Sequence, residues 1–192
     1  MISEIKRCLM EEAQAIINLT NSINEDDIIP FLDILSRCKG KRCFTGVGKS
    51  LMVARKIASS FSSIGYSSIE VDPLRLLHGD LGFFSKDDLL IAISNSGETD
   101  SIVSALRYVK SLGVEIISIT GNDASSVARM SSCHLTVRTH EAGAFGLVPS
   151  SSTTAVMALG DALLCGLIKR DRLSVSVFHR YHPGGELGHS EK

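Results

Sequence analysis

The hydrophobic positions of the chain fall into short runs and longer periodic stretches that alternate along the sequence. Segments of strand length that contain apolar residues occur at 42–45, 68–71, 89–94, 114–119 and 134–137, and the segment 89–94 is a nearly continuous apolar run. Between them, apolar residues recur at helical spacing over 51–64, 100–113, 124–130 and 152–169. Strands that alternate with helices predict an α/β fold with a parallel, doubly wound sheet.

Two amphipathic helices are predicted before the first strand, over 3–22 and 25–38. Their apolar surface predicts packing onto the sheet or onto another subunit. The helix predicted over 152–169 is apolar on nearly all sides, as expected for a helix in the core or in an interface. No linker, repeat or low-complexity tract divides the chain. We therefore expect one domain over 1–192, with 1–40 as an N-terminal helical pair.

The composition fits a single globular domain, because 44% of the 192 residues are hydrophobic and 21% are charged. The formal net charge of −1 argues against a surface for nucleic acid or for an anionic membrane. Charges occupy the first residues, where a signal peptide would be apolar, and no apolar run reaches about 18 residues. We expect a cytoplasmic protein with no membrane and no nucleic-acid partner.

Cysteine and histidine positions predict neither a disulfide framework nor a metal site. The five cysteines are scattered and form no CxxC pair, and the six histidines are dispersed. We therefore expect no metal and no other cofactor.

The loops after the strands are where chemistry is expected, because doubly wound sheets bind ligands beyond the carboxyl ends of their strands. The 89–94 strand ends in Ser-Asn-Ser-Gly and leads into a helix. Backbone N–H groups and the hydroxyls of Ser94, Ser96 and Thr99 therefore converge. This arrangement predicts an anion site; the alternative is that Ser96 or Thr99 merely caps the helix.

The turn Gly-Val-Gly-Lys-Ser at 46–50 resembles two nucleotide-binding motifs and satisfies neither. Cys43 stands where a Walker A loop needs a glycine, and Leu51 stands where the dinucleotide fingerprint needs its third glycine. The turn therefore predicts a site for a smaller phosphate or a polar sugar, served by Lys49 and Ser50 at a helix N-terminus. The alternative is a solvated Lys49.

Four further residues are candidates for acid–base chemistry: His78, Glu98, Glu141 and His182. Each has an ordinary alternative, such as a surface histidine or a carboxylate that compensates a helix dipole. The Pro/Gly-rich segment around His182 is predicted to fold over a site in the same or a neighbouring subunit. With the phosphate loop and Lys49, these residues are what a proton-shuttling reaction on a phosphorylated sugar requires.

Five segments carry a family resemblance: GVGKS (46–50), LHGDLG (77–82), AISNSGET (92–99), GLVPSSSTTAVMALGDAL (146–163) and HPGGELG (182–188). Together they resemble the sugar isomerase (SIS) domain family. More narrowly, they resemble its arabinose-5-phosphate isomerases, which interconvert ribulose 5-phosphate and arabinose 5-phosphate. The likeness covers about residues 35–190.

The resemblance implies a three-layer α/β/α sandwich and a homotetramer with active sites between subunits. It also implies a phosphorylated sugar substrate, no required metal, and a product that feeds Kdo biosynthesis for lipopolysaccharide or capsule. The implied catalytic residues are Lys49, His78, Glu98, Glu141 and His182. The implied binding residues are Gly48, Ser50, Ser94, Asn95, Ser96, Thr99, Ser151 and Ser152.

The implied reaction moves a carbonyl between C1 and C2 through a cis-enediol(ate). Either Glu141 or His182 would take the carbon-bound proton, and the other, or His78, would move the hydroxyl protons. Lys49 would stabilise the developing negative charge, and Glu98 would orient the sugar. The base needs a pKa near neutrality, which a carboxylate is expected to reach by burial.

Three departures from the family pattern accompany the resemblance. Many relatives continue into a pair of CBS domains, whereas this sequence ends at Lys192. Residues 142–145 are Ala-Gly-Ala-Phe where Ala-Cys-Pro-Leu is common, and Leu51 stands where glycine is usual. Three alternatives stay open: an isomerase of a phosphohexulose or phosphoheptose, a non-catalytic sugar-phosphate sensor, and an oligomerisation domain that has lost its activity.

Overall fold

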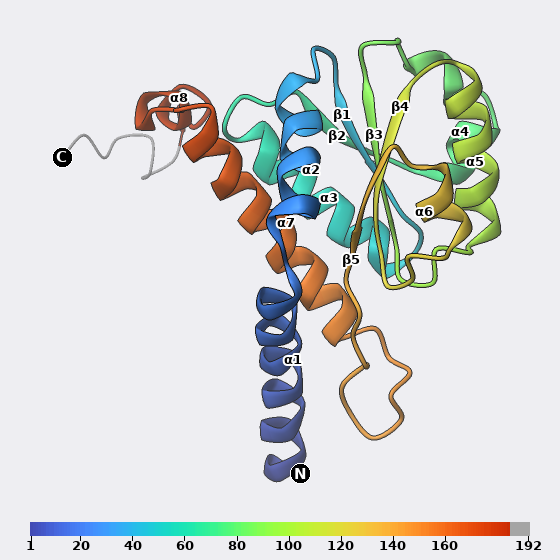
Figure 1. Ribbon diagram of the computed structural model, residues 1–192. Coiled ribbons are helices and arrows are strands. Elements are labelled where there is room, and N and C mark those ends of the chain that lie inside the picture. Colours follow the sequence, from blue (N-terminus) through green and yellow to red (C-terminus); the bar gives the residue numbers. More distant parts are fainter. Residues whose placement is uncertain (185–192) are drawn as a thin grey trace.

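The structure is a computed structural model that describes residues 1–184. Its centre is a five-stranded parallel sheet in the order β2-β1-β3-β4-β5 (Figure 1). The strands are β1 (Arg42–Thr45), β2 (Ser68–Val71), β3 (Leu89–Ser94), β4 (Glu115–Thr120) and β5 (Cys133–Thr136). Because every neighbouring pair is parallel, all strands have their carboxyl ends at the same end of the sheet.

Helices cover both faces of the sheet and complete a three-layer α/β/α arrangement (Figure 1). One face carries α2 (Glu25–Arg37), α3 (Lys49–Ser62) and α7 (Ser151–Arg170). The other face carries α4 (Pro73–Leu77), α5 (Asp100–Ser111) and α6 (Ser126–Met130). Each face has its own hydrophobic core, so the central strand β3 is buried at all six positions. The predicted fold class is confirmed.

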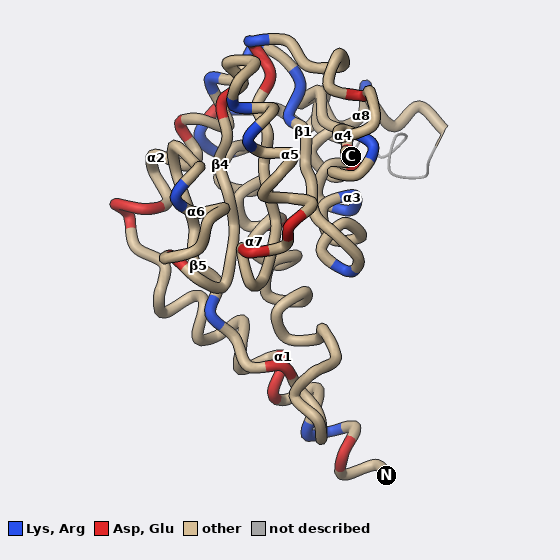
Figure 2. Tube along the Cα trace, turned by 90° about the vertical axis from the view of Figure 1, so that its right-hand side faces the viewer, with Lys and Arg blue, Asp and Glu red and all other residues tan. Residues whose placement is uncertain are grey.

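The long helix α1 (Ile2–Ser22) packs on α7 mainly through its C-terminal half, where Ala15 and Leu19 are buried. Its N-terminal half extends away from the domain, past the carboxyl end of the sheet, as Figures 1 and 2 both show. The large apolar side chains exposed there are Met1, Ile2, Ile5, Leu9 and Met10. This half of α1 is therefore an apolar surface that packing on another subunit would cover.

The helix α7 packs against α1, α2 and α3, although its length and mean hydropathy of 1.5 would also suit a membrane span. It packs closely against Ile57 of α3 at the buried residue Gly160. A Cβ atom at Gly160 would lie 2.5 Å from both Cδ1 and Cγ1 of Ile57. The absence of a side chain at this position therefore sets how closely the two helices pack.

We expect Gly160→Ala to lower the free energy of unfolding by about 1–3 kcal/mol, because the β-branched Ile57 has little freedom to move in a packed core. Gly166→Ala in the same helix is the matched control, since a Cβ there would lie 3.4 Å from Leu32, an ordinary contact. Urea denaturation measures both variants. Equal stability of the two would contradict the packing described.

Three short elements are not predicted by the sequence pattern: α4, the 3₁₀ turn η1 (Asp80–Phe83) and α8 (Val175–Arg180). Each is too short to show a helical period. For α4 a start signal exists, because the Asp72 side chain accepts a hydrogen bond from the backbone N–H of Leu74 and Pro73 follows at the first helical position.

Candidate active site

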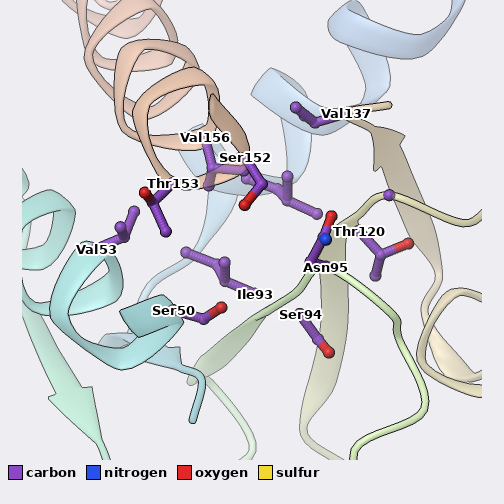
Figure 3. Close-up of a pocket in the computed structure, with 12 residues that line it drawn as sticks. Ser50, Val53, Ile93, Ser94, Asn95, Thr120, Val137, Ser152, Thr153 and Val156 are labelled. Atoms are coloured by element: carbon purple, nitrogen blue, oxygen red, sulfur yellow. The ribbon is translucent and has the colours of Figure 1, made fainter. Parts of the chain in front are cut away.

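A small pocket lies between the carboxyl ends of β3 and β4 and the first turns of α3 and α7 (Figure 3). Its volume is about 20 Å³, which is room for about one water molecule. Four of the predicted binding residues line it: Ser50, Ser94, Asn95 and Ser152. The fold thus brings together polar side chains from three distant segments of the sequence.

Other residues line the same pocket: Val53, Ile93, Ile119, Thr120, Gly121, Val137, Thr153 and Val156. Sequence analysis does not single out Thr120 and Gly121. A signal for them exists, because a polar and a small residue directly follow a buried strand, as in the Ser94 loop. The backbone N–H of Gly121 donates to the carbonyl of Asn95 over 2.9 Å, which joins the two loops.

The loop that leads from β3 into α5 leaves the first turn of that helix without a side-chain cap. Ser94 Oγ accepts from the N–H of Gly97 over 3.1 Å, and Ser96 Oγ accepts from the N–H of Glu98 over 3.2 Å. Thr99 occupies the N-cap position and makes no capping hydrogen bond. The structure therefore shows the alternative, a helix cap by Ser96 or Thr99, to be wrong. The free N–H groups of α5 are suited to an anion.

Gly97 makes this loop possible. Its φ of +67° lies in the left-handed region, and a Cβ atom there would lie 2.2 Å from Ser125 Oγ. A residue with a side chain would therefore displace the loop from the start of α6.

Four buried hydroxyls have no hydrogen-bond partner in the part of the chain that the structure describes: those of Thr45, Ser68, Thr139 and Ser151. Ser151 is the first residue of α7, and Thr45 is the last residue of β1. Buried hydroxyls usually have a partner. The predicted binding residue Ser151 therefore has unused hydrogen-bonding capacity.

Glu141 lies at the start of α7 and is tied to that helix by hydrogen bonds. Its Oε2 accepts from the N–H groups of Ser150 and Ser152 over 2.9 and 3.1 Å, and from Ser150 Oγ over 3.3 Å. Its Oε1 accepts from Ser152 Oγ alone among the described residues, and so keeps a lone pair. Because the Ser152 hydroxyl donates to Glu141, its oxygen is left to accept from a ligand hydroxyl.

Burial raises the pKa of Glu141, but hydrogen bonds from Ser152 and Ser150 outweigh burial and hold the pKa below its ordinary value. Burial therefore does not bring this carboxyl toward the neutral pKa that a proton-transfer base needs. Glu141 is ionised at neutral pH, and its charge is stabilised by the N-terminus of α7.

This lowered pKa makes a prediction for stability. The stabilisation from the Glu141 carboxylate is complete above its ordinary pKa and is lost as the pH falls through the lower folded value. Melting temperatures of wild type and Glu141→Gln should differ at pH 7 and converge as the pH falls below that lowered pKa, where a protonated Glu141 resembles the amide. A difference that does not change with pH would contradict this assignment.

Glu98 is exposed, and its carboxylate faces α6 instead of the pocket. Its Oε1 accepts from the N–H of Ser126 over 2.8 Å, at the first residue of α6. Hydrogen bonds from Ser126, and to a lesser degree the charge of Arg129, lower its pKa. The contact fastens the Ser94 loop to α6. The predicted role of Glu98 in orienting a sugar stays a prediction.

Lys49 and His78 are both exposed, at the first residue of α3 and directly after α4. Neither side chain has a hydrogen bond or ion pair with the residues that the structure describes. Their sequence neighbours Gly48 and Gly79 both have positive φ, at the ends of their loops. A cleft of about 510 Å³ has Leu51 and Gly79 among its lining residues, but neither Lys49 nor His78 lines it. The structure therefore does not bring these two candidate side chains into a common pocket, and their roles stay predictions.

His182 follows α8 and is held in one orientation. Its ring stacks on Phe178, with ring centroids 3.8 Å apart, and its Nδ1 lies 2.8 Å from the Phe178 carbonyl oxygen. Because a carbonyl oxygen only accepts, Nδ1 carries the proton of the neutral ring and Nε2 carries a lone pair. This is the form that can act as a base.

One chain does not bring His182 and Glu141 together. Glu141 binds the first turn of α7, whereas His182 follows the last turn, and a 20-residue helix is about 30 Å long. The ring of Tyr181, next to His182, contacts Gly65 beyond the C-terminal end of α3. His182 therefore lies toward the amino end of the sheet, away from the pocket at the carboxyl end.

Within residues 1–184, no group of three or more His, Cys, Asp or Glu side chains is arranged to hold a metal ion. The expectation that the protein needs no metal or other cofactor stays a prediction.

Comparisons with known proteins identify similar chains. The model of the SIS domain family matches residues 34–165. Arabinose 5-phosphate isomerase KpsF of Escherichia coli O6:H1 is 38% identical over 189 residues, 98% of this chain and 58% of that protein. Arabinose 5-phosphate isomerase KdsD of Escherichia coli K12 is 41% identical over 184 residues, 95% of this chain and 56% of that protein.

This chain therefore spans less than two thirds of the length of these relatives. Among solved structures, Escherichia coli CFT073 c3406 in complex with arabinose 5-phosphate aligns with a TM-score of 0.90 and 37% identity. That alignment covers 95% of this chain and 97% of the other.

Proposed function

The chain belongs to the SIS domain family, and from that premise we propose that it interconverts D-ribulose 5-phosphate and D-arabinose 5-phosphate. The observation that carries the proposal is the pocket at the carboxyl end of the sheet, which brings Ser50, Ser94, Asn95 and Ser152 together next to the uncapped N-terminus of α5. Similar proteins named arabinose 5-phosphate isomerase, and a similar structure in complex with arabinose 5-phosphate, support this substrate.

The phosphate of the substrate is assigned to the Ser94 loop. The free N–H groups of α5 and the hydroxyls of Ser94, Ser96 and Thr99 are available there, with Ser50 on the opposite wall. The N-terminus of α7 already has the Glu141 carboxylate, so a second anion is disfavoured at that helix. The sugar hydroxyls are therefore assigned to Ser152 and Glu141.

The isomerisation needs one carbon-bound proton to move. A base removes the proton from C1 of ribulose 5-phosphate, which gives a cis-enediol(ate), and returns a proton to C2 while the O1 hydroxyl proton passes to O2. His182 is the better candidate for the base, because its Nε2 has a free lone pair. Glu141 Oε1, which keeps a lone pair, is assigned to the hydroxyl protons. Lys49 is assigned to the developing negative charge.

The separation of His182 from Glu141 in one chain requires that a second copy supply one of them. A site between subunits, in the homotetramer that the sequence implies, meets this requirement. The exposed apolar half of α1 is a surface available for such assembly. A cytoplasmic location and a product that feeds Kdo biosynthesis complete the proposal.

A panel of sugar phosphates tests the activity. The purified protein should convert arabinose 5-phosphate and ribulose 5-phosphate into each other, with the same rate in EDTA. Faster conversion of a phosphohexulose or a phosphoheptose would favour the alternative isomerase. Saturable binding of these compounds with no conversion of any would favour the sensor.

A further inference from the structure

Two adjacent glutamates of helix α1 form hydrogen bonds with residues close to Glu141. Glu12 Oε2 accepts from the Thr154 hydroxyl over 2.6 Å, and Glu11 Oε2 accepts from the backbone N–H of Gly143 over 2.9 Å. Both glutamates are half-buried, whereas most of the surrounding α1 side chains are exposed. These contacts join residues more than 130 positions apart in the sequence, since their separations are 142 and 132 residues.

The two contacts bracket the Glu141 carboxylate. Gly143 is two residues beyond Glu141, and Thr154 is two residues beyond Ser152, whose N–H and hydroxyl both donate to Glu141. The backbone N–H of Thr154 donates to the Ser150 carbonyl over 2.9 Å. A shift of Thr154 would therefore move both serines that hold the carboxylate.

Few other contacts connect residues 138–143 to α1. A cleft of about 360 Å³ separates α1 from residues 138–143, and Glu11, Gln14 and Glu141 are among its lining residues. Beyond Gly143 the side chains of Phe145, Leu147 and Val148 are exposed. The position of Glu141 on this side thus depends on a few hydrogen bonds instead of on core packing.

We propose that Glu12, acting through Thr154, is a positioning residue for Glu141, and that Glu11 supports it through Gly143. This inference rests on the proposed function, because it gives Glu12 a part in the same reaction. Glu12 touches neither the pocket nor the assigned phosphate loop. Its loss should therefore affect the reacting geometry and leave substrate binding nearly unchanged.

Four variants test the proposal: Glu12→Ala, Glu12→Gln, Thr154→Val and the double variant Glu12→Ala/Thr154→Val. We expect Glu12→Ala and Thr154→Val each to lower kcat at least about tenfold, with KM within about twofold of wild type, because small displacements of catalytic groups are costly. The double variant should have about the same kcat as either single variant, because both substitutions remove the same hydrogen bond, the one between Thr154 and Glu12. Glu12→Gln should restore most of the rate, since its amide oxygen still accepts from Thr154.

Lys6→Ala is the control, because Lys6 lies on the same helix, is exposed, and its side chain makes no hydrogen bond or ion pair with the described residues. It should leave kcat unchanged. Equal loss in Glu12→Gln and Glu12→Ala, additive loss in the double variant, or a change confined to KM would overturn the proposal.

Hydrogen exchange separates this inference from the proposed function, because it needs no substrate. The N–H groups of Ser150 and Ser152 should exchange faster in Glu12→Ala and Thr154→Val than in wild type, and Glu12→Gln should protect them. If wild type does not isomerise the pentose phosphates but this pattern holds, the proposed function fails and the positioning by Glu12 stands. Unchanged exchange in all variants, with an active wild type, would overturn the positioning alone.

Discussion

His182→Asn is expected to lower kcat by about 10²–10⁴-fold, the usual contribution of a positioned acid–base group. The asparagine amide can still donate to the Phe178 carbonyl, as Nδ1 does in the wild type. It lacks the basic Nε2 that is assigned to the carbon-bound proton. The loss should therefore appear in kcat and leave binding of arabinose 5-phosphate nearly unchanged, as measured by calorimetric titration.

His179→Asn is the matched control for this prediction. His179 lies on the same short helix α8 and also contacts the Phe178 ring, with ring centroids 6.4 Å apart. It has no assigned part in the reaction, so its variant should keep the wild-type kcat. A nearly normal kcat in His182→Asn would remove His182 from the mechanism.

Glu141→Gln is expected to lower kcat by at least about 100-fold, because an amide cannot take up a hydroxyl proton. Its NH₂ group would also face the donors at Ser150 and Ser152, so the start of α7 should be less stable by about 1–2 kcal/mol. Steady-state kinetics and thermal unfolding separate the two effects. No described residue of the Ser94 loop forms a hydrogen bond with Glu141, so inorganic phosphate should inhibit variant and wild type equally.

Glu141→Asp tests the cause of that loss. It keeps a carboxylate with a shorter side chain, so partial activity is expected. Full activity in Glu141→Gln, or equal inactivity of both variants with unchanged stability, would contradict the assigned role of the charge.

Mixed assemblies of the two inactive variants test whether the site is shared between chains. If Glu141 and His182 of one site come from different subunits, random co-assembly of Glu141→Gln and His182→Asn restores about a quarter of the sites. Co-expressed variants should then regain measurable activity. A mixture no more active than its components would contradict a shared site.

The central strand β3 was predictable from the sequence because a parallel strand buried on both faces needs a continuous apolar run. The ranges of β1, β2 and β3 match the predicted segments 42–45, 68–71 and 89–94. The strand β4 begins and ends one residue later than predicted, because its ladder with β3 runs from Glu115, opposite Leu89, to Thr120, opposite Ser94. Similarly, β5 begins at Cys133, which pairs with Ile117.

The helix α3 begins at Lys49, two residues before the predicted start at 51. The glycines at 46–50 predict a turn over the whole segment, but the positive φ of Gly48 ends the loop there. Lys49 and Ser50 therefore lie on the first turn of the helix. Such a boundary depends on backbone conformation, which composition alone does not reveal.

The candidate site was only partly predictable. Ser50, Ser94, Asn95 and Ser152 meet in one pocket because residues that follow parallel strands share one end of the sheet. The hydrogen bonds of Glu141 and Glu98 to the starts of α7 and α6 were not predictable, because they depend on how separate elements pack.

The sequence also gives no distance between Glu141 and His182. That distance is set by the helix α7, which separates the two residues. The apolar residues of α7 predict its length, but they do not predict at which end of the sheet each flanking loop lies. The motif HPGGELG extends beyond the described residues, so the predicted folding of residues 185–188 over a site lies outside them.

Proton NMR of the purified protein with ribulose 5-phosphate in D₂O, with and without EDTA, tests the proposed isomerase most directly. We expect arabinose 5-phosphate to appear with deuterium at C2, because the proton removed at C1 exchanges with solvent before a proton returns to C2. The rate should be the same in EDTA. If neither arabinose 5-phosphate nor exchange at C1 is observed, the assignment of this chain as an arabinose-5-phosphate isomerase is contradicted.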